Sequence, residues 1–266
     1  MIKNCLYKIA VVVAFVFISQ SVFAWGTTGH RVVAEIAERH LTKKAKKNIA
    51  KLFGREPLAF WANWADFIKS DTTGKWKEVS AWHYVDLPGH LSKDEFVKAL
   101  KAIDHKSLYS QIPAMENILK DNHASLEDKE VALRLLIHFV GDLHQPLHVG
   151  RPEDKGGNDI EEFWFGKQTN LHAIWDDALV DYQKWSYTEY ADNIDVASKE
   201  AVAQIQSGTL EDWFYQSHEL ADEIYDRTPA NSHLSYKYNY MFYWKLNQQL
   251  LDGGLRLAEI LNNIFG

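Results

Sequence analysis

The sequence predicts a mainly α-helical fold, arranged as a single multi-helix domain with at most a short β-hairpin. Apolar residues recur every three or four positions over most of the 266 residues, which is the period of an amphipathic helix. Only Ile160 to Phe165 has the composition of a strand. No repeat, low-complexity tract or linker divides the chain, and its length suits one domain with a substantial core.

The first 24 residues are predicted to be a cleavable signal peptide, which leaves residues 25–266 as the folded domain. Lys3 and Lys8 give a basic start, Ile9 to Ile18 is apolar, and a small-residue cleavage signal ends at Ala24. About 10 apolar residues are too few to span a bilayer. We therefore expect a secreted or periplasmic protein without stable membrane association.

Composition limits the possible partners. The only cysteine, Cys5, lies in the predicted signal peptide, so the mature chain has no disulfide. The net charge is −7, and removing the two leader lysines makes it −9, which argues against a basic nucleic-acid-binding surface. Three bound divalent cations would reduce that charge to −3, so an acidic chain can still present a cationic cleft.

Apolar periodicity predicts the helices in order along the chain. The first begins near Gly29, and the others cover residues 93–104, 111–121, 127–144, 172–183, 189–206, 210–225 and 236–264. Residues 127–144 are apolar almost all round, which is typical of a buried helix, and Pro146 prevents its continuation. Gly253 and Gly254 are expected to loosen the last helix.

Two His-x-x-x-Asp pairs, His138 with Asp142 and His172 with Asp176, are the first candidate metal ligands. Residues four apart share a helix face, so each pair can direct an imidazole and a carboxylate at one point. Nitrogen and oxygen ligands of this kind bind divalent metals. The alternative is a hydrogen-bonded core histidine with a helix-capping aspartate. His148, just beyond Pro146, favours the metal because the chain can turn back there.

Polar residues inside aromatic segments supply further candidates. Trp61-Ala-Asn-Trp64-Ala-Asp66 and Trp82-His83-Tyr84-Val85-Asp86 place acids and a histidine among large apolar side chains. Most of the tryptophans are expected in the core, but Asp66 and His83 need polar partners there. His144 is offset from the ligand face and is expected either to be structural or to support a metal ligand from behind. Asp177 and Asp181 lie nearby, but only Asp176 keeps the four-residue spacing from His172.

The start of the mature chain completes the candidate set. After cleavage, Trp25 would carry a free α-amine with a pKa near 8, and the deprotonated amine is a nitrogen ligand. The Trp25 carbonyl could complete a chelate, and His30 follows at the start of the first helix. The alternative is a disordered terminus with a capping histidine.

Taken together, these motifs resemble the S1/P1 nuclease family. Members are zinc-dependent, single-strand-preferring nucleases with 3′-nucleotidase activity, and they share a superfamily with zinc-dependent bacterial phospholipases C. The resemblance runs from Trp25 to about Asp176, with a compatible helical remainder. It rests on the Trp25-to-His30 start, Trp64-Ala-Asp66, His83-Tyr-Val-Asp86, the His138-to-His148 run, Gly156-Gly157-Asn158 and His172-Ala-Ile-Trp-Asp176.

The resemblance implies three zinc ions in a fold of the phospholipase C/P1 nuclease type. One zinc would be held by Asp66, His83, His138 and Asp142. A second would be held by His148, His172 and Asp176. The third would be held by the Trp25 amine and carbonyl, His30 and a bridging oxygen of Asp142. The expected activity is hydrolysis of single-stranded DNA or RNA and 3′-nucleotides to 5′-phosphates and 3′-hydroxyls, by a monomer.

The resemblance also assigns four residues to catalysis and substrate binding. Asp86 would orient the nucleophile or accept its proton. Tyr84 would stack on a base, with core packing as the alternative, and Asn158 would bind the base edge. Lys69 stands where well-known members have an arginine beside the phosphate, so the charge is kept but the planar bidentate fork is lost.

Two other functions are compatible with these residues. A phospholipase C-like phosphoesterase would use the same ligands, although that branch commonly ends its motif with Glu where this chain has Asp176. A non-enzymatic zinc-binding protein would keep the ligands but would have no use for Asp86.

Overall fold

The computed structural model describes residues 25–266 and confirms the mainly α-helical fold. In chain order the α-helices are α1 Thr27–Arg39, α2 Lys43–Phe53, α3 Leu58–Trp61, α4 Trp64–Phe67, α5 Lys93–Lys101, α6 Leu108–Lys120, α7 Leu126–Leu143, α8 Leu171–Ala173, α9 Leu179–Tyr182, α10 Tyr187–Ile194, α11 Lys199–Gln206, α12 Leu210–Arg227 and α13 Tyr236–Phe265. Between them lie the 3-10 turns η1 Ile68–Ser70, η2 Val79–His83, η3 Pro146–Val149 and η4 Pro152–Asp154, and the π-helical turn η5 Ile174–Ala178.

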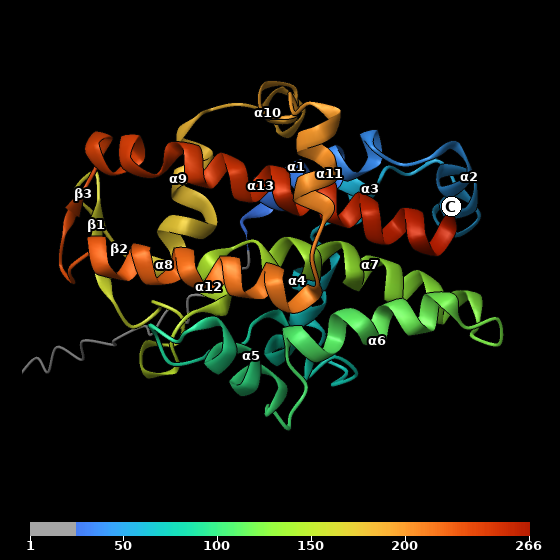
Figure 1. The fold of residues 1–266 in the computed structure, drawn as a ribbon, viewed down its shortest axis with the longest axis horizontal. Coiled ribbons are helices and arrows are strands. Elements are labelled where there is room, and N and C mark those ends of the chain that lie inside the picture. The colour runs from blue at the N-terminus through green and yellow to red at the C-terminus, as the bar shows by residue number, and fades with distance from the viewer. Residues whose placement is uncertain (1–24) are drawn as a thin grey trace, which may run out of the picture.

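Helices α1, α7 and α13 form the centre of the molecule, and α13 runs along its length (Figure 1). Every residue of α7 from Leu135 to Leu143 is buried, as its nearly continuous apolar sequence predicts. The expectation that the glycine pair loosens α13 was wrong, because the helix is unbroken over 30 residues. A Cβ on Gly254 would lie 2.5 Å from Cβ of Ile36, so glycine here lets α13 pack closely against α1.

Several helical segments differ from the sequence-based prediction, and the short helices α3 and α4 were also not predicted. The predicted helix 189–206 is two helices, because Asp195 leaves helical geometry with φ −81° and ψ 62° and Ser198 caps α11. The predicted helix 172–183 contains the π-helical turn η5. Helix α2 was missed, although its buried residues Ala45, Ile49 and Phe53 are spaced four apart.

A small sheet lies at one end of the molecule (Figure 1). Strand β1 Glu161–Trp164 pairs antiparallel with β2 Lys167–Asn170 through a turn in which Phe165 and Gly166 both have positive φ, as a two-residue hairpin favours. Strand β3 His233–Leu234 pairs parallel with β1 and adds a strand beyond the predicted hairpin. Asn170 ends β2 and caps α8, where its side chain accepts a hydrogen bond from the amide of Ala173.

The predicted signal peptide lies outside the described residues. Among residues 25–266, none of the helices has the length and apolar character needed to cross a bilayer.

Candidate metal centre and catalytic cavity

Helix α7 supplies the central pair of candidate ligands. His138 and Asp142 are both 0 % exposed, and His138 Nε2 lies 3.5 Å from Oδ2 of Asp142. Both side chains leave the helix on one face because they are four residues apart. The predicted pairing on this helix is therefore present.

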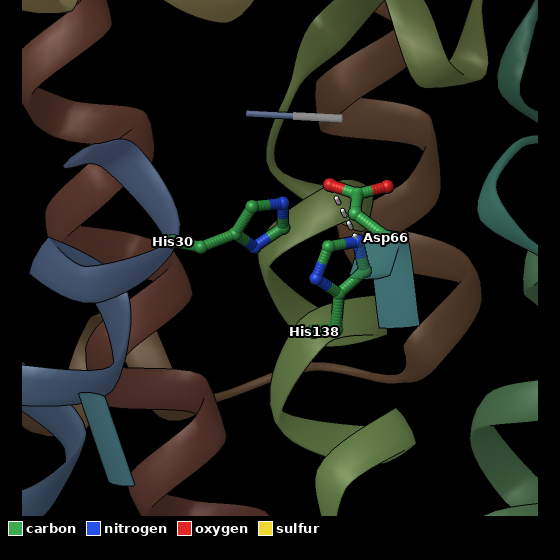
Figure 2. Close-up of side chains that lie close together, drawn as sticks. All are labelled: His30, Asp66 and His138. Atoms are coloured by element: carbon green, nitrogen blue, oxygen red, sulfur yellow. Dashed lines mark ion pairs between the residues drawn. The ribbon is translucent and has the colours of Figure 1, made fainter. Parts of the chain in front are cut away.

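Six other helices or turns surround this pair with the remaining predicted His and Asp residues. All are 8 % exposed or less: His30 on α1, Asp66 on α4, His83 on η2, His148 on η3, His172 on α8 and Asp176 on η5. With His138 and Asp142 they form what we call the His/Asp cluster. Figure 2 shows His30, Asp66 and His138 directed toward one another from three separate elements.

Four histidine rings of the cluster are fixed by the same device. Each places Nδ1 within hydrogen-bonding distance of a backbone carbonyl. Because a carbonyl only accepts, Nδ1 carries the proton and Nε2 keeps its lone pair. The pairs are His83 with Val79 at 2.8 Å, His138 with Ala62 at 2.7 Å, His148 with His83 at 2.7 Å and His172 with Gly156 at 2.6 Å. All four Nε2 atoms are buried and have no hydrogen-bond partner among residues 25–266.

The candidate ligand atoms converge into three groups, two of which share His138, and within each group they lie within 4.8 Å of one another. These groups are His30 with Asp66 and His138, His83 with His138 and Asp142, and His148 with His172 and Asp176. The last group is the predicted second metal site. In it, His172 Nε2 lies 3.3 Å from Oδ2 of Asp176 and His148 Nε2 lies 3.8 Å from Oδ1. The geometry suits more than one metal ion.

Burial disfavours the charged forms of the His and Asp side chains in the cluster. Burial lowers the pKa of His148, and lowers that of His172 to about 4, so these rings stay neutral. Burial, reinforced by neighbouring carboxylates, raises the pKa of Asp142 and Asp176 well above the ordinary value. Neutral imidazoles with free lone pairs beside buried carboxylates are the donor set of a divalent cation, so the residues present fit bound metal.

The N-terminal segment lies against this cluster. Trp25 is fully buried, and the next amide, that of Gly26, donates to the carbonyl of Asp176 at 2.7 Å. His30 Nε2 lies 3.4 Å from Oδ1 of Asp142, and its ring stacks on His138 at 3.7 Å between centroids. Neither ring nitrogen of His30 has a hydrogen-bond partner in the described part of the chain. This arrangement differs from a disordered terminus with a capping histidine.

A cavity of about 430 Å³ opens beside the cluster. Its lining includes His83, His148 and His172 together with all four predicted catalytic and substrate-binding residues, Lys69, Tyr84, Asp86 and Asn158. Tyr84 is 44 % exposed, so its ring is accessible in the cavity wall and not part of the core. Lys69 Nζ lies 2.6 Å from Oδ1 of Asp66, so the cation also touches a candidate ligand.

Asp86 has the environment of a proton acceptor or donor near neutral pH. Burial raises its pKa to about 7, and the charges of Asp154 and Glu153 add to the shift. Its Oδ1 is buried without a hydrogen-bond partner in the described chain. A carboxyl group that titrates near the working pH is suited to general acid–base catalysis.

Gly156 and Gly157 form a tight turn beside the candidate ligand His172. Both have positive φ, 65° and 82°, and a Cβ on Gly156 would lie 2.3 Å from the carbonyl oxygen of Leu147. The carbonyl of Gly156 also holds the His172 ring. Glycine is required here because the turn approaches the backbone of the neighbouring loop.

Comparison with known proteins agrees with this geometry. A model of the S1/P1 nuclease family matches residues 25–266, which is most of the chain. The chain belongs to the S1/P1 nuclease family.

Plant and fungal nucleases are similar to this chain. Endonuclease 2 of Arabidopsis thaliana is 27 % identical over 96 % of both chains. Nuclease P1 of Penicillium citrinum is 28 % identical over 91 % of this chain and 98 % of its own. Nuclease S1 of Aspergillus oryzae is 30 % identical over 60 % of this chain and 55 % of its own.

Some residues of the nuclease site were not predicted. Gln145 donates from Nε2 to Oδ1 of Asp176 and so orients a candidate ligand. Its position inside the His138-to-His148 run was the available signal. Ser80, Leu147 and Lys155 complete the lining of the cavity, and no sequence pattern distinguished them. His144 points elsewhere, as expected, and Asp181 accepts a hydrogen bond from Thr28.

Proposed function

We propose that the chain is a secreted, tri-zinc phosphodiesterase that hydrolyses single-stranded DNA or RNA, and 3′-nucleotides, to 5′-phosphates and 3′-hydroxyls. One observation carries the proposal. Buried histidine Nε2 atoms without hydrogen-bond partners in the described chain point at Asp142 and Asp176, and Tyr84 lines the cavity beside them. Family membership and the names of the relatives support a nucleic-acid substrate.

The zinc ligands are assigned within the His/Asp cluster and the processed N-terminus. Asp66, His83, His138 and Asp142 hold one ion, and His148, His172 and Asp176 hold another. The Trp25 amine and carbonyl, His30 and Asp142 hold the third. Bound zinc supplies Lewis-acid stabilisation of charge at the phosphoryl group.

The other residues act on substrate directly. Tyr84 stacks on an unpaired base, and a duplex base reaches it only by leaving the helix, which gives single-strand preference. Asn158 binds the base edge, while Lys69 contributes positive charge at the phosphate. Asp86 holds the proton of the attacking water because its carboxyl group titrates near neutral pH.

Metal analysis of the processed protein, paired with a cleavage assay on single-stranded DNA, tests this function. We expect three zinc ions per chain and cleavage that is lost in Asp86→Asn while the zinc content is kept. That result excludes a zinc-storage protein, since storage has no use for Asp86. Zinc binding without hydrolysis of any phosphodiester or 3′-nucleotide would contradict the proposal. Hydrolysis of phosphatidylcholine in place of single strands would assign the site to a phospholipase C-like enzyme.

The third zinc site depends on removal of residues 1–24. One extra residue before Trp25 turns its amine into an amide, which is no longer a nitrogen ligand. We expect protein with a single added N-terminal glycine to bind two zinc ions and to lose activity, compared with protein processed at Ala24. Full zinc content and full activity in the extended form would refute the role of the amine.

A further inference from the structure

A row of exposed aromatic side chains follows the outer face of α13. Tyr236, Tyr240 and Trp244 are 69 %, 83 % and 76 % exposed, and we call them the aromatic ridge. They are four residues apart, so they share a helix face at intervals of about 6 Å along its axis. A single exposed aromatic residue needs no explanation, whereas a continuous exposed row is typical of a binding surface.

The aromatic surface continues beyond both ends of the ridge. The Tyr236 ring meets Phe165 edge-on at 4.8 Å, and Phe165 stacks on Tyr182 at 5.6 Å. At the far end, Trp244 lines a cavity of about 1110 Å³ whose wall also contains Trp185. Ring faces are therefore available over a length of more than two helical turns.

Charge along this helix favours an anionic partner. From Tyr236 to Leu251, α13 has no acidic residue, although the whole chain has a net charge of −7. Two exposed lysines, Lys237 and Lys245, flank the ridge. Lys245 forms an ion pair with Glu223 of α12, which neutralises that neighbouring acid. The cavity beyond Trp244 is also lined by Asp212, Glu219 and Asp252, so only the ridge itself is without acids and compatible with a polyanion.

The ridge is linked to the catalytic cavity along the β1–β2 hairpin. Asn158 lines the catalytic cavity and also a neighbouring cavity of about 370 Å³, whose wall includes Gln168 and Asn170 of the hairpin. The acids Asp159 and Glu161 also line it, and Asp159 is paired with Lys155 at 2.9 Å. The turn of the hairpin carries Phe165, which touches the first ring of the ridge, and Figure 1 shows the sheet beside the start of α13.

We propose that the aromatic ridge is a second, non-catalytic binding site for single-stranded nucleic acid. Bases remote from the cleaved bond stack on it while another nucleotide of the same strand occupies the catalytic cavity. Every base has a π-face, so such stacking is independent of sequence. A base that inserts between two protein rings requires the rings to be about 7 Å apart, which is twice the 3.4 Å spacing of stacked bases. The interval of about 6 Å between successive rings of the ridge along the axis of α13 is close to this distance.

This inference rests on the proposed nuclease function, and substrate length provides its test. In Tyr240→Ala/Trp244→Ala, we expect KM for a 30-nucleotide single strand to rise by at least about 10-fold, because two stacking contacts are lost. Hydrolysis of a dinucleotide, which is too short to reach the ridge, stays unchanged. Tyr240→Phe/Trp244→Phe keeps the rings and restores the long-strand KM. Phe60→Ala, which removes a 60 % exposed ring on α3, is the matched control and leaves both substrates unaffected.

Direct binding separates the ridge from the catalytic proposal. In an Asp86→Asn background, which suppresses cleavage, fluorescence anisotropy of a labelled 30-nucleotide strand measures affinity alone. Weaker binding after ridge substitution supports the exosite, even if the wild-type protein proves to cleave neither substrate and the proposed function fails. Equal losses on dinucleotide and long strand, or unchanged strand binding, would overturn the inference. So would a ridge-dependent dimer in light scattering, or ridge-dependent binding to phosphatidylcholine vesicles, since each assigns the surface to another partner.

Discussion

Two buried polar clusters lie at the C-terminal end of α7, and they differ in whether their polar atoms have hydrogen-bond partners. In the His/Asp cluster around Asp142, five histidine Nε2 atoms and both Asp142 oxygens have no hydrogen-bond partner among residues 25–266. Two residues later, His144 donates from Nδ1 to the Val140 carbonyl at 2.7 Å and its Nε2 lies 2.9 Å from Arg256. Arg256 also donates to the Ile205 carbonyl and to Gln216.

The comparison shows that burial of histidine or charge does not by itself identify a functional site. Buried polar groups in folded proteins are nearly always partnered, so a partnered cluster is explained by the fold alone. Several unpartnered donor atoms directed at one place require something from outside the chain. The first cluster therefore has the donor set of a metal site, whereas the hydrogen bonds within the His144–Arg256 cluster already satisfy its polar groups.

Substitution of Asp142 should give the largest difference between the clusters. Asp142→Asn removes the carboxylate shared by two proposed zinc sites, and we expect single-strand cleavage to fall by more than about 100-fold with loss of bound zinc. The metal-free protein should become more stable, because a buried carboxylate no longer has to remain unpaired. Kinetics, metal analysis and urea unfolding of the metal-free protein measure the three effects. Asp226→Asn, at an exposed acid, is the control, and unchanged zinc content in Asp142→Asn would contradict the assignment.

Removal of metal from the wild-type protein is the next test. Binding at 100 to 1,000 times Kd stabilises a fold by about 2.7–4.1 kcal/mol. For a domain of this length, chelation should therefore lower Tm by roughly 5–15 °C, and added zinc should restore it. The same treatment of Asp142→Asn should produce a smaller shift. An unchanged wild-type Tm after complete metal removal would show that the cluster needs no cation for stability.

The sequence predicted which residues form the His/Asp cluster because their spacing is local. His138 with Asp142, and His172 with Asp176, were recognisable from a four-residue interval, and Asp66 and His83 from polarity inside aromatic segments. These signals follow from helix geometry and from the cost of burying polar groups. The mainly helical fold was predictable for the same reason.

Features that depend on distant contacts were not predictable. The carbonyls of Ala62 and Gly156 that orient two of the rings are 76 and 16 residues from their partners. The π-helical turn at Asp176 and the pairing of β3 with β1 likewise depend on the assembled core. His144 was expected to be structural, but Arg256, 112 residues away, could not be named as its partner.

Breaking the complete cluster should affect stability and leave catalysis intact. Arg256→Leu leaves His144, Gln216 and the Ile205 carbonyl without their donor, and we expect a loss of about 3 kcal/mol in the free energy of unfolding. Zinc content and kcat per folded molecule should be unchanged, since none of these groups faces the His/Asp cluster. Arg256→Lys keeps the positive charge but loses the planar guanidinium group. Its free energy of unfolding should lie between those of Arg256→Leu and the wild type. A loss of zinc in folded Arg256→Leu would show that the two clusters are coupled.

Glu162 on β1 is a buried carboxylate without full hydrogen bonds among residues 25–266, and it lies apart from the groups of potential metal ligands. Substitution of Glu162 is expected to have the smallest effect of these changes. Its side chain is fully buried, and neither carboxylate oxygen makes a full hydrogen bond within the described residues. Burial raises its pKa to about 7, and the backbone amide of Ser232 only partly offsets the shift. It belongs to none of the three groups of potential metal ligands.

The raised pKa fixes the sign of the pH dependence at Glu162. An unfolded glutamate has a pKa of about 4.3, so between that pH and about 7 the folded chain binds more protons than the unfolded chain. Its contribution to stability is therefore present below pH 4.3 and is lost as pH rises to about 7. Glu162→Gln stays neutral, so it should match the wild type near pH 4 and melt a few degrees higher at pH 8. Unchanged zinc content in this variant would show that an isolated unpartnered carboxylate, unlike the convergent set around Asp142, does not make a metal site.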